Sequence, residues 1–199
     1  RQVRAHGIGR TACAGGGDEV QGRLIEALSS RGAAPAAAGV VSTRIPIANA
    51  IIKAKTVMER AGVPAIADDS GIGVDALDGA PGIYSARYAN VEGSEQDAAN
   101  NTKLLEVLSS TPDSQRSARF VCALAYCVPN KEPVIFRDTF EGSIGYAERG
   151  ENGFGYDSIF RVQNDTRTSA ELSPAEKNAI SHRGKAVRSF VEFLKSTPL

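Results

Sequence analysis

The sequence has few of the residues that build disulfide frameworks or metal clusters. Its 199 residues include three cysteines and two histidines. An odd number of cysteines without paired spacing argues against a disulfide framework, and two histidines are too few for a multi-histidine metal site. Cys122 and Cys127 lie in one apolar run, where we expect them to be buried in a strand. A reducing, cytoplasmic location is the expectation that follows.

The chain also lacks a charge bias and a long apolar segment. Lys+Arg and Asp+Glu both number 23, so the net charge is zero and nothing global attracts nucleic acid or a membrane surface. No stretch is long enough to span a membrane. The arginine-bearing start lacks the apolar core of a signal peptide, although its shortage of acids also fits a transit peptide. We therefore expect neither a nucleic-acid nor a membrane partner. Any anionic ligand must be bound by a local cluster of positive charges.

The chain length suits one domain, residues 1–199, divided into two lobes. Residues 1–44 are crowded with Gly, Ala and Arg, and only 18–32 indicates a helix there. From Asn49 onward the patterns predict helices and strands in an α/β fold. Two long strands around a turn at 129–131 favour an antiparallel pair. The expected helices are 49–62, 94–110, 173–179 and 181–196, and the expected strands are 63–67, 71–77, 117–128 and 132–145.

Three helix details follow from the same patterns. Asn49 is expected to cap the helix that it begins, and Ser173 to form a capping box with Glu176. Val57 and Ala98 are expected to face inward because they share a helix face with other apolar residues.

Asp68 and Asp69 are adjacent carboxylates that directly follow the strand expected at 63–67. Successive strand residues point to opposite faces, so the two can meet one ligand only if the strand has ended. Adjacent carboxylates repel each other unless a cation lies nearby, and Mg²⁺ suits a site with few carboxylates. A solvated turn in which Asp caps the following segment fits the same residues.

Two further clusters could bind a nucleotide. Lys177, His182, Arg183 and Lys185 lie around the start of the last helix, where backbone N–H groups favour anions. In Gly153-Phe154-Gly155, the glycines allow close approach of the backbone and the phenylalanine could stack on a base. Each cluster alone also fits an ordinary structure: a solvated helix face, or a tight turn with a core phenylalanine. Together with the aspartates they indicate a Mg²⁺-dependent nucleotide enzyme or a nucleotide-binding protein.

Three segments carry a resemblance to a known family: "PAIADDSGIGVDALDGAPGIYSARYA", "ENGFGYDSIF" and "AELSPAEKNAISHRGKA". They resemble the inosine/xanthosine triphosphate pyrophosphatases, which release pyrophosphate from nonstandard purine nucleoside triphosphates such as ITP, dITP and XTP. The resemblance runs from about Asn49 to the C-terminus. It implies an α/β fold with an elongated mixed β-sheet flanked by helices, two lobes with a central nucleotide cleft, a homodimer and a requirement for Mg²⁺.

The resemblance also implies roles for individual residues. Asp69 would be the general base and a metal ligand, with Asp68 as its acidic neighbour at the metal. Ser70 would contact the substrate, and Lys53 would lie near the phosphates. The residues implied to line the nucleotide pocket and read the purine are Phe154, Gly155, Tyr156, Asp157, Lys177, His182 and Arg183.

Residues 1–48 depart from the family. The family's Ser/Thr-Gly-Asn-x-x-Lys loop is replaced by "HGIGRTACAGGG", its glutamate before Asn49 by Ala48, and an acidic pair by Val40-Val41. Three interpretations are open: the first 44 residues are out of frame or wrongly assigned relative to the natural protein, the chain is an impaired member, or Gly15–Gly17 forms a substitute phosphate loop. The expected function is hydrolysis of ITP, dITP and XTP. The alternative is a nucleotide-binding regulatory protein without catalysis.

Overall fold

The computed structural model describes residues 41–197 of the chain. The helix expected at 18–32 and the phosphate loop of the first residues lie outside these described residues. The organisation of residues 1–199 as one domain stays a prediction. Within the described part, no helix is both long and apolar enough to cross a membrane.

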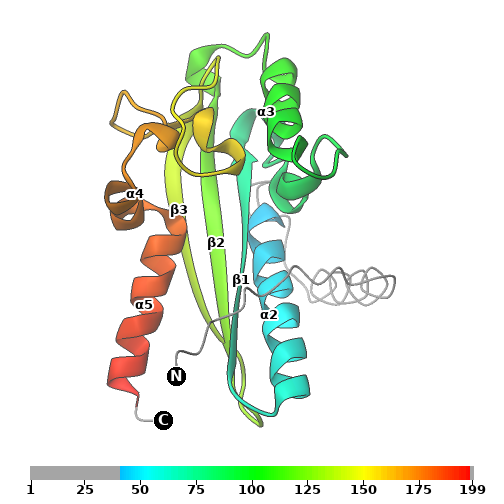
Figure 1. The fold of residues 1–199 in the computed structure, drawn as a ribbon, viewed down its shortest axis with the longest axis vertical. Coiled ribbons are helices and arrows are strands. Elements are labelled where there is room, and N and C mark those ends of the chain that lie inside the picture. The colour runs from blue at the N-terminus through cyan, green and yellow to red at the C-terminus, as the bar shows by residue number, and fades with distance from the viewer. Residues whose placement is uncertain (1–40, 198–199) are drawn as a thin grey trace, which may run out of the picture. The chain divides into compact units, whose positions relative to one another are not determined.

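Helices and strands follow one another in the order α2, β1, α3, β2, β3, β4, α4, α5, and this mixture confirms the α/β class (Figure 1). The helices are α2 (Val41–Ala61), α3 (Gln96–Val107), α4 (Pro174–Ile180) and α5 (His182–Ser196). The strands are β1 (Ala65–Val74), β2 (Ser117–Cys127), β3 (Val134–Ile144) and β4 (Phe160–Val162). Short 3₁₀ segments occur at Asp75–Leu77, Gly82–Arg87, Asp113–Gln115, Gly155–Ser158 and Ser169–Glu171.

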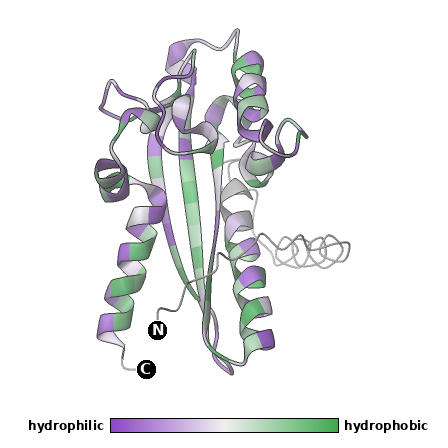
Figure 2. Ribbon diagram, in the orientation of Figure 1, coloured by the Kyte–Doolittle hydropathy of each residue, from purple (hydrophilic) through white to green (hydrophobic). Residues whose placement is uncertain are grey.

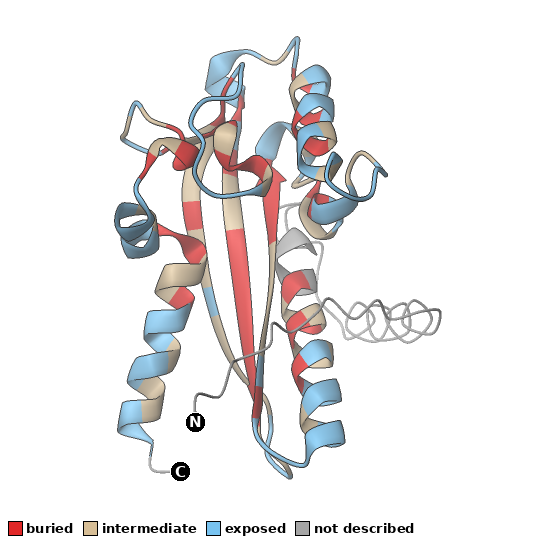
Figure 3. Cartoon of the chain, in the orientation of Figure 1, coloured by how far each residue is buried: buried red, intermediate tan, exposed pale blue. Residues whose placement is uncertain are grey.

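The four described strands form one sheet in the order β1-β2-β3-β4. Each neighbouring pair is antiparallel, so the sheet of the described residues is antiparallel rather than the mixed sheet that was expected. The predicted antiparallel pairing of β2 with β3 is confirmed by the register between two long strands on either side of a short turn. The central strand β2 is mostly apolar and buried (Figures 2 and 3).

Strand β1 corrects one prediction that matters for the site. The sequence predicted a strand that ends before Asp68 and a second strand at 71–77, but β1 runs without interruption from Ala65 to Val74. Its register with β2 continues through the aspartates, pairing Asp68 with Leu124 and Asp69 with Ala123. Glycine is required at position 71 of this strand, because a Cβ there would lie 2.5 Å from the carbonyl oxygen of Gly82.

The two faces of the sheet carry different packing. On one face α2 packs small residues against the strands: Ala50, Ala54, Ala123 and Ala125 are all buried there. On the other face α5 packs on larger groups, with Phe136 and Phe190 against the buried Cys122 and Leu124. Because side chains alternate along a strand, neighbouring residues of β1 belong to different faces.

Helix α2 differs from its prediction at both the start and the exposed side. It begins at Val41 rather than at residue 49, so Asn49 lies inside the helix and does not cap it. Val57 is 54% exposed and does not join the packed face. Helix propensity alone could not locate this start, because Pro46 lies inside the helix.

The two C-terminal helices begin where the sequence predicted. Ser173 accepts a hydrogen bond from the Glu176 N–H at 3.3 Å, and the Glu176 carboxylate accepts one from the Ser173 N–H at 2.8 Å. Ser181 caps α5 by accepting from the Gly184 N–H at 3.1 Å. These caps fix the start of α4, which carries Lys177, and the start of α5, whose His182 stacks on Phe120 of β2.

Candidate active site

Asp69 lies on the α2 face of β1, between two polar side chains of that helix. Its Oδ1 accepts from Lys53 Nζ at 2.5 Å, and its Oδ2 accepts from Asn49 Nδ2 at 3.1 Å. The Asp69 side chain is 16% exposed, so it is largely shielded from solvent while Lys53 reaches outward. The small alanines of α2 bring the helix close enough for these contacts.

Asp68 lies on the opposite face, beside the start of α5. Its Oδ2 accepts from Arg183 Nε at 3.0 Å and from Ser70 Oγ at 3.4 Å. Ser70 shares this face because it lies two residues along the strand, and it contacts the Arg183 guanidinium at 3.5 Å. Asp68 and Ser70 thus hold Arg183.

The separation of the two aspartates corrects the expectation that they share one metal ion. Their side chains leave β1 on opposite faces and pair with different helices. Among residues 41–197, no three His, Cys, Asp or Glu side chains gather in a cluster suited to a metal ion. On the α2 face Asp69 alone supplies a carboxylate from β1, a donor set that suits Mg²⁺ only if substrate phosphates and water complete the coordination.

Phe154 lies in an exposed loop ahead of α4. Its side chain is 68% exposed, which excludes a core phenylalanine at this position. Lys177 Nζ lies 5.4 Å and Arg183 Cζ lies 5.8 Å from the centre of its ring. An exposed aromatic ring with two cations beside it can stack on a flat base and offer hydrogen-bond donors to the edge of that base.

Gly153 and Asp157 determine the shape of this loop. Gly153 has a φ of +85°, a conformation that favours glycine, and a Cβ there would collide with the Asp157 carboxylate. Asp157 is buried and accepts from the Phe154 N–H at 2.9 Å and from Ser169 Oγ at 2.8 Å. It also forms an ion pair with Lys177. One buried carboxylate therefore joins the aromatic loop to a cation of α4.

Tyr156 corrects a further expectation. It was expected to line the nucleotide pocket, but it is 4% exposed and belongs to the main hydrophobic core. Its hydroxyl donates to the Ser85 carbonyl oxygen at 2.8 Å, and burial raises the pKa of this hydroxyl. Tyr156 therefore connects the loop to the hydrophobic core and presents no free polar group to a ligand.

His182 is the first residue of α5 and is buried beneath the site. Its ring stacks on Phe120 with 5.1 Å between ring centres and 8° between planes. Burial, assisted by the neighbouring Arg183, lowers the pKa of His182 to about 4. The imidazole is therefore neutral at pH 7, and its buried Nδ1 has no hydrogen-bond partner among the described residues. A neutral imidazole can offer one donor and one acceptor.

Besides the contacts of His182 and Arg183 with β2 and β1, helix α5 also binds β3 through Lys185. Lys185 Nζ donates to the Thr139 carbonyl oxygen at 2.7 Å and lies 3.4 Å from an oxygen of Asp138. Lys185 is thus occupied by the sheet, whereas Arg183 and Lys177 lie beside Phe154. The cluster predicted around the start of the last helix divides into an anchor and a group at the aromatic ring.

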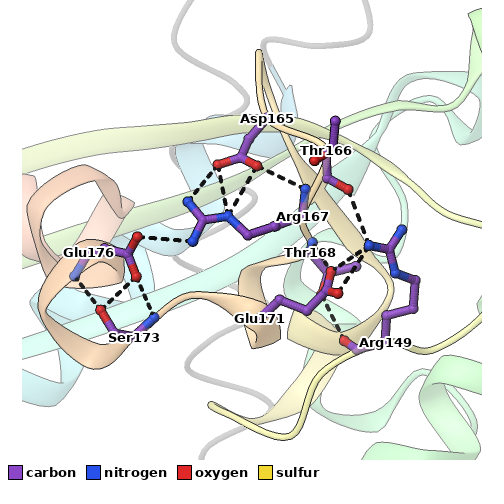
Figure 4. A network of polar contacts seen from close by, with 8 residues as sticks. All are labelled: Arg149, Asp165, Thr166, Arg167, Thr168, Glu171, Ser173 and Glu176. Carbon is purple, nitrogen blue, oxygen red and sulfur yellow. Dashed lines mark hydrogen bonds and ion pairs between the residues drawn. The ribbon is translucent and has the colours of Figure 1, made fainter.

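A network of ion pairs supports the start of α4 (Figure 4). Arg167 bonds Asp165 at 2.9 Å and Glu176 at 2.9 Å. These contacts, with the hydrogen bonds from Ser173 to Glu176, lower the pKa values of both carboxyls to about 2. Because Lys177 follows Glu176 directly, the network fixes the turn that carries Lys177.

Two functional contacts escaped the sequence interpretation. Asn49, expected as a helix cap, reaches Asp69, and Asn101, in the middle of α3, reaches the aromatic loop. A signal for Asn101 was present, because Asn100 and Asn101 share the buried side of α3 with Leu104 and Leu108. An asparagine among inward-facing leucines indicates a buried polar contact, since it is a poor residue for a helix interior. Ala98, expected on that side, is exposed.

Comparison with known proteins supports the resemblance that the three quoted segments carry. The sequence profile of the Ham1 family matches residues 42–193. The chain is 51% identical over 140 residues to the dITP/XTP pyrophosphatase of Exiguobacterium sibiricum, a match that covers 70% of each chain. The structure of a HAM1 protein from Coxiella burnetii superposes with a TM-score of 0.71 and 46% identity, covering 76% of this chain and 77% of that chain.

A third relative extends over more of the chain. The crystal structure of the nucleoside-triphosphatase, or dITP/XTP pyrophosphatase, from Mycobacterium abscessus gives a TM-score of 0.65 at 36% identity. That match covers 92% of this chain and 97% of the other. The family profile begins at residue 42, so residues 1–41 of the departing segment lie outside it, whereas Ala48 lies within the matched range.

Proposed function

Because this chain belongs to the Ham1 family, we propose that it hydrolyses nonstandard purine nucleoside triphosphates, ITP, dITP and XTP, to the monophosphate and pyrophosphate. The observation that carries the proposal is the exposed Phe154 ring beside Lys177 and Arg183. Relatives from Exiguobacterium sibiricum and Mycobacterium abscessus are named dITP/XTP pyrophosphatases.

The base end of the site is assigned to the aromatic loop. The purine stacks on Phe154, and the Arg183 guanidinium donates to the 6-oxo group of hypoxanthine or xanthine. Adenine carries a 6-amino group, which would leave that donor without an acceptor, and sites built on such donors discriminate strongly against the wrong base. The buried His182, which precedes Arg183 and stacks on Phe120, is neutral and adds no charge that would alter this preference.

The phosphate end is assigned to the α2 face of β1. In this proposal Lys53, whose side chain is 54% exposed, contacts a phosphate oxygen, and Asp69, which pairs with it, accepts a proton from the attacking water. Asp69 would also hold Mg²⁺, with water and phosphate oxygens as the other ligands. When bound, the ion neutralises charge that develops on the phosphates. The water attacks the α-phosphorus, its proton passes to Asp69, and the bond to pyrophosphate breaks.

A nucleotide-binding protein without catalysis is the second candidate function. It is favoured by the departure of residues 1–48 from the family loop that cradles the triphosphate. A homodimer and a cytoplasmic location stay predictions, which sedimentation and cell fractionation would check.

One experiment separates the two functions. The protein is incubated with ITP and Mg²⁺, and pyrophosphate release is measured with ATP as the matched control. We expect IMP and pyrophosphate from ITP and little turnover of ATP. Binding of ITP in calorimetry without pyrophosphate release would replace the enzyme with the binding protein, and the absence of both would refute both.

A further inference from the structure

The peptide groups on both sides of Gly155 are held by one helix that is distant in the sequence. The Gly155 N–H donates to Asp97 Oδ2 at 2.9 Å, and its carbonyl oxygen accepts from Asn101 Nδ2 at 3.1 Å. Both side chains belong to α3, and the contacts join residues 58 and 54 positions apart. Gly155 directly follows Phe154, so α3 holds the peptide next to the exposed ring.

Asn101 contributes little to α3 itself. It is 3% exposed, and asparagine is a poor residue for a helix interior. Its Nδ2 also reaches Ser158 Oγ at 3.1 Å and Glu148 Oε2 at 3.4 Å, so one amide contacts three positions around the aromatic loop. A buried amide that spans several segments fixes their relative positions more tightly than an apolar side chain would.

The contacts from α3 complete a set around Phe154. The Phe154 N–H donates to Asp157, and Asp157 pairs with Lys177, which lies beside the ring. Asp97 and Asn101 take the next N–H and the next carbonyl along the chain. Gly155 itself has a φ of +61°, a conformation that glycine adopts readily, so the backbone conformation alone does not hold the ring in place. The position of the ring relative to the cations therefore depends on α3 as well as on α4.

We propose that Asp97 and Asn101 are positioning residues, which hold the Phe154 ring at the distance from Arg183 that purine selection requires. The inference rests on the proposed function, in which the base stacks on this ring. Stacking is present in both the bound substrate and the transition state. A loosened ring should therefore raise KM more than it lowers kcat. It should also reduce discrimination, because the base no longer meets Arg183 in a fixed geometry.

The first test observes the ring without using activity. The chain contains no tryptophan, so Phe154→Trp introduces a single indole at the ring position, which can be excited selectively over the tyrosines. Adding Asp97→Ala should raise acrylamide quenching of the indole and lower its anisotropy. Adding Asp97→Asn should change both less, because the amide oxygen can still accept from the Gly155 N–H. Glu106→Ala, which removes an exposed acid further along α3, serves as the matched control.

The second test measures kinetics with Phe154 in place. Asp97→Ala should raise KM for ITP about tenfold, the effect of roughly one charge-assisted hydrogen bond, and lower the ITP-to-ATP ratio of kcat/KM. Asp97→Asn should restore most of both, and Glu106→Ala should change neither. Asn101→Ala should act in the same direction, with circular dichroism to confirm that it folds.

The outcomes distinguish this inference from the proposed function. Indole quenching in the Asp97→Ala background that equals the Glu106→Ala control would overturn the inference. Increased quenching with unchanged KM and unchanged ITP-to-ATP ratio would overturn it as well. If the unsubstituted enzyme releases no pyrophosphate from ITP, the proposed function fails, while the indole measurement still decides whether α3 holds the ring.

Discussion

The two faces of β1 differ in what they offer to a ligand, although their carboxylates come from adjacent residues. On the α2 face, Asp69 is largely shielded and contacts Lys53 and Asn49 over a layer of alanines. On the α5 face, Asp68 is 39% exposed and contacts Arg183 over a layer of aromatic rings. The difference indicates a division of labour. In the proposed function, small residues bring an amine and a carboxylate together for chemistry, and large rings support a guanidinium for recognition.

The proposed division would account for the two aspartates that the chain carries side by side. A single carboxylate on a strand can serve only one face. Two successive carboxylates serve both faces. They also connect the purine end and the phosphate end of the proposed site through one peptide bond, so no flexible segment lies between them. The following predictions change one face at a time, from the largest expected effect to the smallest.

The largest effect is expected on the α2 face. Asp69→Asn keeps the size of the side chain but removes the proposed general base, so kcat for ITP should fall about 10²- to 10⁴-fold. Binding of ITP, measured by calorimetry without Mg²⁺, should change only a few-fold, because the contacts to the purine are untouched. Retention of more than about a tenth of kcat would show that Asp69 is not the general base.

The second prediction concerns the buried histidine of the α5 face. The pKa of His182 falls from 6.5 to about 4 in the folded protein, so the unfolded chain binds a proton first as the pH falls. The stabilising contribution is complete above pH 6.5 and is lost as the pH falls to about 4. It should amount to about 3 kcal/mol.

The groups that face His182 contribute to this shift in both directions. Burial and the cations Arg183 and Lys177 lower its pKa, whereas Asp157 and Asp68 raise it. His182→Phe should therefore flatten the decrease in unfolding free energy between pH 7 and pH 4, measured by urea denaturation at each pH. An unchanged slope would mean that the imidazole is not buried in its neutral form.

The third prediction concerns the carboxylate that holds Arg183. Asp68→Asn should raise KM for ITP about three- to tenfold, since the pair is partly exposed and solvent screens it. Discrimination against ATP should decrease, because Arg183 is less firmly oriented. Steady-state kinetics on both nucleotides would measure this, and an unchanged KM would remove Asp68 from base recognition.

The smallest effect is expected in the ion-pair network behind α4 (Figure 4). Arg167→Gln removes the contacts to Asp165 and Glu176 and should raise KM for ITP by less than about threefold, because exposed pairs contribute little. Arg149→Gln, in the same network but paired with Glu171, is the matched control. A larger rise in KM for Arg167→Gln would show that the turn carrying Lys177 depends strongly on this network.

The sequence was sufficient for elements whose signals are local. The β2–β3 hairpin follows from two long strand patterns around a turn at Asn130, and the start of α4 follows from Ser173 and Glu176. These features need only neighbouring residues, so pattern and capping chemistry predict them. The clusters that contain Phe154 and Arg183 were recognised for the same reason.

The remainder depends on contacts between distant residues. Asp68, Asp69 and Gly71 are weak strand formers, and only the pairing with β2 keeps β1 continuous through them. The opposite orientation of the two aspartates follows from that continuity. The contact of Asn101 with the aromatic loop spans 54 residues, and no local pattern could locate its partner.

The most direct test of the division between the two faces is a side-by-side measurement of kcat and KM for ITP in Asp68→Asn and Asp69→Asn. The two variants make the same isosteric change at adjacent positions. The division predicts a large loss of kcat with little change in ITP binding for Asp69→Asn, and a rise in KM with kcat largely retained for Asp68→Asn. Equal losses of kcat in both variants would contradict it, because both carboxylates would then act at one centre.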